Sequence, residues 1–190
     1  MTKILKTAIL LLLLVGLCAR PSFTQEMQKS DGAKAVPGAS QAVLGAWNEI
    51  GKKLIAMAED FPEDKFDYKP TPAVRSFAEQ LLHAAGSMEY FTGPVQGKAP
   101  GSENPPRATY KTKADVVAFV KKEVENGATA IKSKGDKGMA DLITDPESKQ
   151  QTRVSDLAYG LIEHSGEHYG QLVVYYRLSG LVPPESRPKK

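Results

Sequence analysis

The chain has only one cysteine, Cys18, among its 190 residues. Because Cys18 lies in or beside an apolar N-terminal segment, the rest of the chain has no disulfide and no nucleophilic thiol of its own. The sequence also lacks internal repeats, a glycine-rich nucleotide loop and a convincing strand pattern. With 41% hydrophobic and 25% charged residues, it predicts a single globular domain that depends on one hydrophobic core.

The N-terminus predicts a secretory signal. Lys3 and Lys6 precede the apolar run 8–17, which is too short for a comfortable membrane span. We therefore expect residues 1–24 to be a signal peptide with its cleavage region, and residues 25–38 to be a flexible tether.

Cleavage could follow Ala19 or Thr24, and both sites predict an exported protein, periplasmic or secreted, without a stable membrane span in its mature form. Lipid attachment at Cys18 is the alternative. Because Leu17 is a poor residue immediately before a lipidated cysteine, plain export is the preferred prediction.

Net charge argues against a nucleic-acid partner. The formal charge is +3, and three of the basic residues, Lys3, Lys6 and Arg20, lie in the predicted leader. The mature protein is therefore close to neutral, whereas a nucleic-acid surface needs a net basic patch to neutralise phosphates.

Four segments have the apolar spacing of three and four residues that is typical of amphipathic helices. They cover about residues 43–61, 77–91, 116–131 and 157–178. Ser76 with Glu79, and Thr112 with Asp115, predict capping boxes before the second and third segments. Ser155 opens the fourth segment, and Pro94 is expected to end the second.

The segments 92–111 and 132–153 are polar and contain glycine, and the first is also rich in proline. They are long enough to cross a bundle rather than to make tight turns. The pattern therefore predicts an all-α four-helix bundle over residues 39–187.

The histidines carry the strongest functional signal. His164 and His168 are four residues apart, so a helix would direct both imidazoles to one side. The third histidine, His83, lies at a similar depth of roughly 10 to 14 Å from the start of its own helix, at about 1.5 Å per residue. Both helices place these imidazoles where a core residue would pack.

Burying imidazoles without partners costs free energy, and a bound cation would supply the partner. The competing interpretation is a set of ordinary core histidines with hydrogen-bond partners. This is preferred for any single histidine, but the three together favour a divalent metal site. Imidazole suits zinc, nickel, iron or copper, and the three residues do not select among them.

Other polar residues near the histidines are weaker candidates. Glu167 could act as a general base, although it should point about 100° away from its neighbours and so toward the surface. Gln171, Tyr175 and Tyr90 could line a pocket, but a hydrogen-bonded core position is the preferred interpretation for each. The sequence identifies no catalytic residue.

The segment 163–184, which includes Glu-His-Ser-Gly-Glu-His-Tyr-Gly-Gln, resembles the C-terminal signature of the DinB-like, damage-inducible family. Further matches are Asp67-Tyr-Lys-Pro70 and Arg75-Ser-Phe-Ala-Glu-Gln-Leu-Leu-His83, and the resemblance covers about residues 40–187.

The resemblance implies an up-down-down-up four-helix bundle with long crossover connections. It also implies a divalent transition metal, such as zinc, nickel or iron, held by His83, His164 and His168. Relatives include thiol-dependent transferases and isomerases, and family members often pair through their helices, so a homodimer is consistent with it.

These observations predict a metal-dependent hydrolase or transferase that acts on a small molecule of unknown identity at an open three-histidine site. The alternative is a noncatalytic exported bundle that binds a metal, a ligand or a protein partner. A further alternative keeps the bundle without any metal. An enzyme needs a pocket that reaches the open coordination position, whereas a fourth protein ligand would close a structural site.

Overall fold

The computed structural model describes residues 36–188. The predicted leader, and the predicted tether as far as residue 35, lie outside the described residues. Four helices form the fold: α1 Ala39–Asp60, α2 Phe77–Val95, α3 Lys113–Gly138 and α4 Val154–Leu178. Two single-turn 3-10 helices, Glu63–Lys65 and Pro184–Ser186, complete the helical elements of the described part of the chain.

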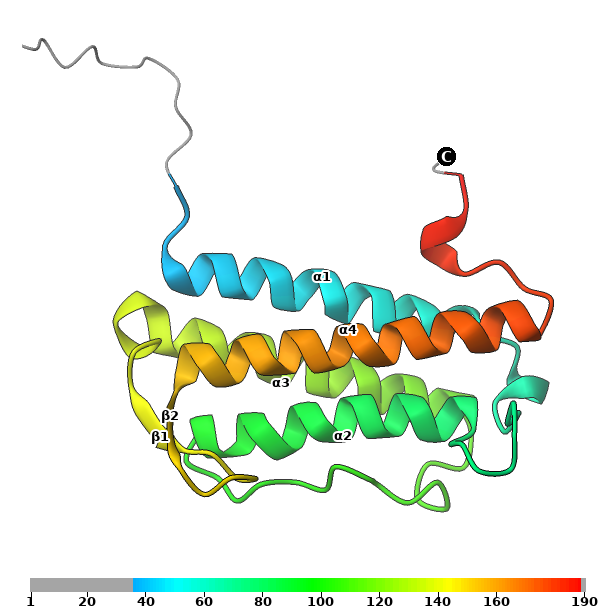
Figure 1. Ribbon diagram of the computed structural model, residues 1–190, viewed down its shortest axis with the longest axis horizontal. Helices are drawn as coiled ribbons and strands as arrows, with labels where there is room; N and C mark the ends of the chain where they lie inside the picture. The colour runs from blue at the N-terminus through cyan, green and yellow to red at the C-terminus, as the bar shows by residue number, and fades with distance from the viewer. Residues whose placement is uncertain (1–35, 189–190) are drawn as a thin grey trace, which may run out of the picture. The chain divides into compact units, whose positions relative to one another are not determined.

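The helices run up, down, down and up, as predicted (Figure 1). The connection 96–112 carries the chain back along the bundle, so that α2 and α3 point the same way (Figure 1). Both α1 and α2 pack chiefly against α3 and α4. The α2–α4 interface is therefore part of the bundle interior.

The predicted apolar stripe of α1 is buried through Trp47, Ile50, Leu54 and Met57. The indole Nε1 of Trp47 donates a 2.8 Å hydrogen bond to the carbonyl oxygen of Val124 on α3. A Cβ atom at Gly127 would overlap the Trp47 ring, so α1 and α3 can approach closely only because residue 127 is glycine. The core is thus built from the expected helix faces.

Both predicted capping boxes are present, at Ser76–Glu79 and Thr112–Asp115. Two helix ends differ from the prediction. α2 continues to Val95 with Pro94 inside its last turn, since proline so near the end disturbs few further backbone hydrogen bonds. α4 begins at Val154 with Arg153 as its N-cap, and not at Ser155.

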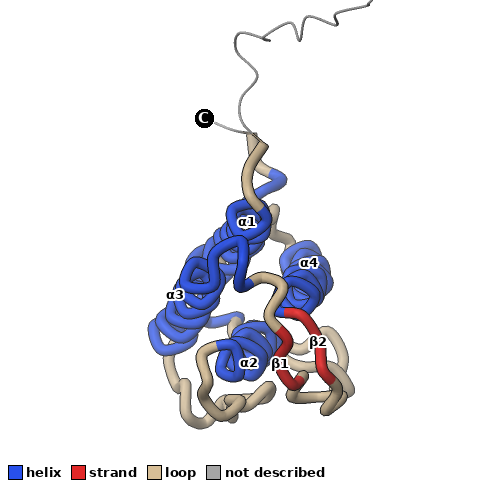
Figure 2. Tube along the Cα trace, turned by 90° about the vertical axis from the view of Figure 1, so that its left-hand side faces the viewer, coloured by secondary structure: helices blue, strands red, loops and turns tan. Residues whose placement is uncertain are grey.

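The third helical segment was expected to end near residue 131, and the sequence showed no convincing strand pattern; the structure differs on both points. α3 continues to Gly138 through a break at Gly135, where φ is +58°. The chain then forms a hairpin of β1, Leu142–Thr144, and β2, Gln151–Arg153, paired antiparallel at one end of the bundle (Figure 2). Strands of three residues are too short to show an alternating pattern in the sequence.

Among the described residues, no helix is long and apolar enough to cross a membrane.

Candidate metal centre

The three histidines of the chain lie together between α2 and α4. His83 comes from α2, and His164 and His168 come from successive turns of α4. One ligand nitrogen from each ring lies within 4.8 Å of the other two. The Nε2 atoms of His164 and His168 are 3.0 Å apart. The structure therefore brings all three predicted ligand residues to one place.

The reason for this convergence differs from the sequence argument. α2 and α4 run in opposite directions (Figure 1), so equal depths from their N-termini do not by themselves place two residues at one level. His83 is the seventh of the 19 residues of α2, and His164 is the eleventh of the 25 residues of α4. Both are near the middle of their helices, where antiparallel neighbours meet.

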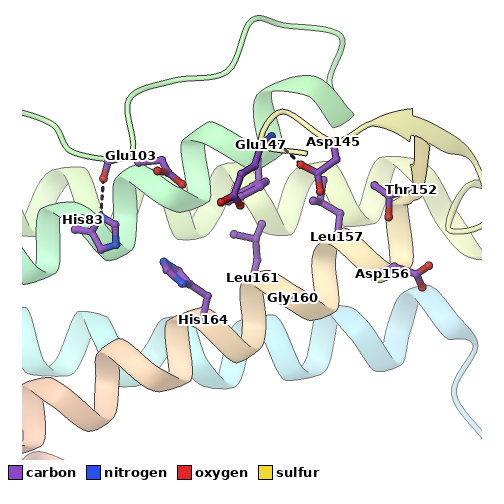
Figure 3. Close-up of a pocket in the computed structure, with 11 residues that line it drawn as sticks. His83, Glu103, Asp145, Glu147, Thr152, Asp156, Leu157, Gly160, Leu161 and His164 are labelled. Atoms are coloured by element: carbon purple, nitrogen blue, oxygen red, sulfur yellow. Dashed lines mark hydrogen bonds between the residues drawn. The ribbon is translucent and has the colours of Figure 1, made fainter. Parts of the chain in front are cut away.

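A main-chain contact fixes the orientation of His83. Its Nδ1 lies 3.0 Å from the carbonyl oxygen of Glu103 (Figure 3). Because a carbonyl oxygen can only accept, Nδ1 carries the proton, and the Nε2 of the neutral ring has a free lone pair. Metal-binding histidines commonly use such a contact to orient the ring.

This contact depends on a close approach between α2 and the connection 96–112. A Cβ atom at Gly86, one turn beyond His83, would lie 2.5 Å from the carbonyl oxygen of Ser102 and 2.9 Å from that of Glu103. Glycine at residue 86 therefore allows the connection to lie on the helix and to present its carbonyl group to His83.

Amide and hydroxyl groups surround the other two imidazoles. The Nδ1 of His168 is 3.3 Å from Gln171 Oε1 and also contacts the side-chain amide of Gln80. The amide of Gln80 in turn donates to Gln171 Oε1. The Nε2 of His164 lies 3.1 Å from the hydroxyl of Ser87. These groups can hold the rings in place while leaving the histidines as the strongest electron-pair donors.

The surroundings of His83 and His168 favour the neutral form of these two imidazoles. His168 is 5% exposed and His83 is 9% exposed. Burial, together with the nearby imidazoles of His164 and His83, lowers the pKa of His168 to about 4. Burial also lowers the pKa of His83, and the positive charge of Arg75 adds to this effect. Neutral imidazoles are the form that coordinates a metal.

The donor set fits a divalent transition metal. A ligand nitrogen from each of three imidazoles faces a common point, and no Asp, Glu or Cys in residues 36–188 joins the group. Zinc, nickel, iron and copper all accept imidazole nitrogen, and three protein ligands leave at least one coordination position for another molecule. The arrangement is therefore that of an open site, without a fourth protein ligand from these residue types.

A cavity of about 470 Å³ reaches this site. His83 and His164 form part of its wall, and Leu157, Gly160 and Leu161 of α4 line its length (Figure 3). This volume lies within the range of pockets that bind small molecules. The structure thus has both features that distinguish an open site from a closed structural one.

The weaker sequence candidates do not line this cavity. Glu167 is exposed, in agreement with its expected direction. The hydroxyl of Tyr175 donates to the carbonyl oxygen of Arg75, and that of Tyr90 donates to the carbonyl oxygen of Pro146 at 2.9 Å. Both tyrosines therefore make the hydrogen bonds expected of the structural role that was preferred for them. Gln171 contacts His168, and Gln171 and Tyr175 line a different cavity of about 710 Å³.

Sequence reasoning missed several residues around the site. Gln80 and Ser87 are three residues before and four residues after His83, so helical spacing could have placed them on the same face. Glu103, Asp145 and Glu147, which line the cavity, come from connections. No periodic pattern links such residues to a site, because only tertiary packing brings them there.

Comparison with known proteins agrees with the fold. The sequence pattern of the DinB superfamily matches residues 46–172. A DinB-like protein from Bacillus cereus is similar in structure, with a TM-score of 0.64 and 17% identity over 76% of this chain and 95% of that one. A DinB-like protein from Bacillus subtilis has a TM-score of 0.60 and 20% identity over 78% and 99% of the two chains. No curated protein matches the sequence.

The fold and the site together define a class: a four-helix bundle with an open cluster of three histidines that could hold a metal ion. The family match covers most of the chain and most of the bundle. The chain belongs to the DinB superfamily.

Proposed function

We propose that this protein is a metal-dependent enzyme that binds a divalent transition metal through His83, His164 and His168 and catalyses hydrolysis or group transfer on a small molecule. The observation that carries this proposal is the cavity of about 470 Å³ whose wall includes two of the three histidines. A metal held only for stability needs no such access.

A bound divalent ion would supply Lewis acidity at the end of the cavity. The residues of the chain orient the imidazoles and line the cavity. The main-chain carbonyl group of Glu103 orients His83. The side chains of Gln80 and Gln171 both contact the Nδ1 atom of His168. The apolar side chains of Leu157 and Leu161 line the cavity and limit the water near the reacting groups.

Elemental analysis tests metal binding. The mature protein is dialysed against mixed zinc, nickel, iron and copper and then analysed beside the His164→Ala variant. Near-stoichiometric metal in the wild type, and its loss in the variant, are expected. The Glu167→Gln variant is the control, since Glu167 is exposed on the same helix and should leave the metal content unchanged. No metal in the wild type would refute the proposal.

Turnover separates catalysis from metal storage. Metal-loaded protein is screened against small esters, amides and thiol conjugates, and hydrolysis or transfer should disappear in His164→Ala and in chelator. A protein that binds the metal stoichiometrically but turns over none of these compounds would favour the noncatalytic alternative.

We also propose that the protein acts outside the cytoplasm. The support is the charged and apolar leader of residues 1–24. Cell fractionation with mass spectrometry of the mature N-terminus tests this. A mature chain that begins after Ala19 or Thr24 is expected, and full-length protein in the cytoplasm would refute the proposal.

A further inference from the structure

Negative side chains dominate the polar lining of the cavity beside the histidines. Among the residues that the structure describes, four acidic residues line it and no lysine or arginine does. They are Glu103, Asp145, Glu147 and Asp156. They come from three separate parts of the chain: the connection 96–112, the turn between β1 and β2, and the first turn of α4. The fold has thus gathered carboxylates that are far apart in the sequence.

Within residues 36–188, these carboxylates have no cationic partner in an ion pair. None of the four forms an ion pair within residues 36–188, whereas acidic residues elsewhere in the bundle do, such as Asp60 with Arg187 and Glu79 with Lys69. Asp145 uses Oδ1 to accept hydrogen bonds from the backbone amides of Glu147 and Ser148. Asp156 accepts one from the hydroxyl of Ser155. These neutral donors leave the negative charges uncompensated.

A metal ion would not reverse this charge. Three neutral imidazoles add nothing, and a divalent ion adds two positive charges against four negative ones. The lining therefore keeps a net negative formal charge when the site is loaded, which favours cations over anions, although solvent screens the exposed carboxylates of Glu147 and Asp156.

The rest of the lining suits a short carbon chain. Phe91, Leu157 and Leu161 provide apolar surface beside the carboxylates. The histidines lie toward one end of the cavity, and Asp145, Thr152 and Asp156 lie toward the other (Figure 3). A ligand with an ammonium group, an apolar body and a reactive group would meet the carboxylates, the leucines and the histidines in turn.

We propose that the cavity selects small cationic substrates that carry an amine. The description of these amines as substrates rests on the proposed function, since a substrate must react at the metal. The selection of cations itself depends only on the carboxylates, so it is also a property of the metal-free protein.

Three linear molecules of similar length and different charge test the selection: putrescine, 1,4-butanediol and succinate. Their binding is followed by the backbone amide NMR signals of Thr152 and Gly160, in both metal-free and zinc-loaded protein. Putrescine is expected to shift these signals in both forms. Butanediol should bind at least tenfold more weakly, and succinate should leave the signals unchanged.

Two double variants each remove two negative charges, one pair from the cavity lining and the other pair from exposed residues outside it. Asp145→Asn with Asp156→Asn removes both carboxylates at the cavity end away from the histidines, while the side-chain oxygen that remains at position 145 can still accept the hydrogen bonds of the turn. This variant should weaken putrescine binding at least tenfold while leaving butanediol unaffected. Glu125→Gln with Glu185→Gln alters exposed residues that do not line the cavity, and should change binding by less than twofold. Thermal midpoints of both proteins establish that each is folded.

The outcomes separate the two proposals. Equal binding of putrescine and butanediol, binding of succinate, or equal losses in the two double variants would overturn the selection of cations, whatever the metal result. Putrescine selectivity in a protein that fails to bind zinc would support the selection and refute the proposed enzyme.

Discussion

The Nδ1 atom of His83 donates a hydrogen bond to the carbonyl oxygen of Glu103, 20 residues further along the chain, at 3.0 Å. This bond connects a helix of the bundle interior to the connection 96–112. It links two features that the sequence presents separately, a candidate metal ligand and an irregular segment rich in proline. Substitutions that displace the connection should therefore affect the metal site from a distance.

Gly86→Ala tests this relationship. The new Cβ would lie 2.5 Å from the carbonyl oxygen of Ser102, so the connection must move away from α2 and the bond to His83 is lost. Loss of such an orienting partner commonly weakens metal binding by about 10- to 100-fold. We expect at least a tenfold weaker zinc affinity, measured by competition with a chromophoric chelator.

Gly45→Ala is the matched control for this substitution. A Cβ atom at Gly45 of α1 would meet nothing within 4 Å, so zinc affinity should remain that of the wild type. Equal affinities in the two variants would show that the Glu103 contact does not orient His83 for metal binding.

Metal removal should lower the thermal stability. A ligand that binds only the folded state at about 100 times its dissociation constant adds about 2.7 kcal/mol to the free energy of unfolding. For a domain of this size, this corresponds to a rise of roughly 5–10 °C in the melting temperature. Scanning calorimetry with zinc and with a strong chelator measures the difference.

The His164→Ala variant should lose this zinc-dependent shift. An unchanged melting temperature of the wild type in chelator would instead favour a bundle without metal.

The metal-free protein should lose stability as the pH falls. The folded pKa of His168 is about 4, against 6.5 for the free side chain, because burial disfavours the charged imidazole. Below pH 6.5 the unfolded chain therefore binds a proton that the folded chain does not. The stabilisation is complete above pH 6.5 and is lost progressively down to about pH 4, by up to about 3 kcal/mol.

Urea unfolding at a series of pH values measures this effect. His168→Gln replaces the imidazole with a group that does not titrate, so its free energy of unfolding should depend less on pH between 4 and 6.5. Parallel curves for the two proteins would contradict the assignment of the effect to His168.

Gly127→Ala should destabilise the α1–α3 contact. The added methyl would overlap the buried ring of Trp47, and such overpacking typically costs about 1–3 kcal/mol. The chain has a single tryptophan, so its fluorescence reports directly on this contact. We expect a lower urea midpoint and a red-shifted emission maximum. If the Gly127→Ala variant kept the urea midpoint and the emission maximum of the wild type, then α1 and α3 could move apart to accept the methyl group without a loss of stability.

The helices themselves were largely predictable. The burial of Trp47, Leu54 and Met57 follows from their spacing, and both capping boxes form as their residues predict. Local hydrogen bonding and the 3.6-residue period determine these features, and both depend only on residues that are a few positions apart in the sequence. The hairpin between α3 and α4 was missed because strands of three residues carry no comparable period.

The candidate site was predictable only in part. His164 and His168 could be paired from their spacing alone, since one helix holds both. His83 could be added because the chain has no other histidine. The partners of these residues were not accessible in the same way. The contact of His83 is a main-chain carbonyl group, which any residue type at position 103 could provide.

The sequence by itself determined the four amphipathic helices, the family and the identity of the three histidines, because periodicity, capping and residue type act over short distances along the chain. Only the tertiary structure decided that the connection 96–112 lies on α2 at Gly86, and that Glu103 and the acidic residues of the hairpin turn line one cavity with the histidines. These relationships depend on how the helices and connections pack. They bring together residues that are far apart along the chain, and no local sequence pattern predicts such contacts.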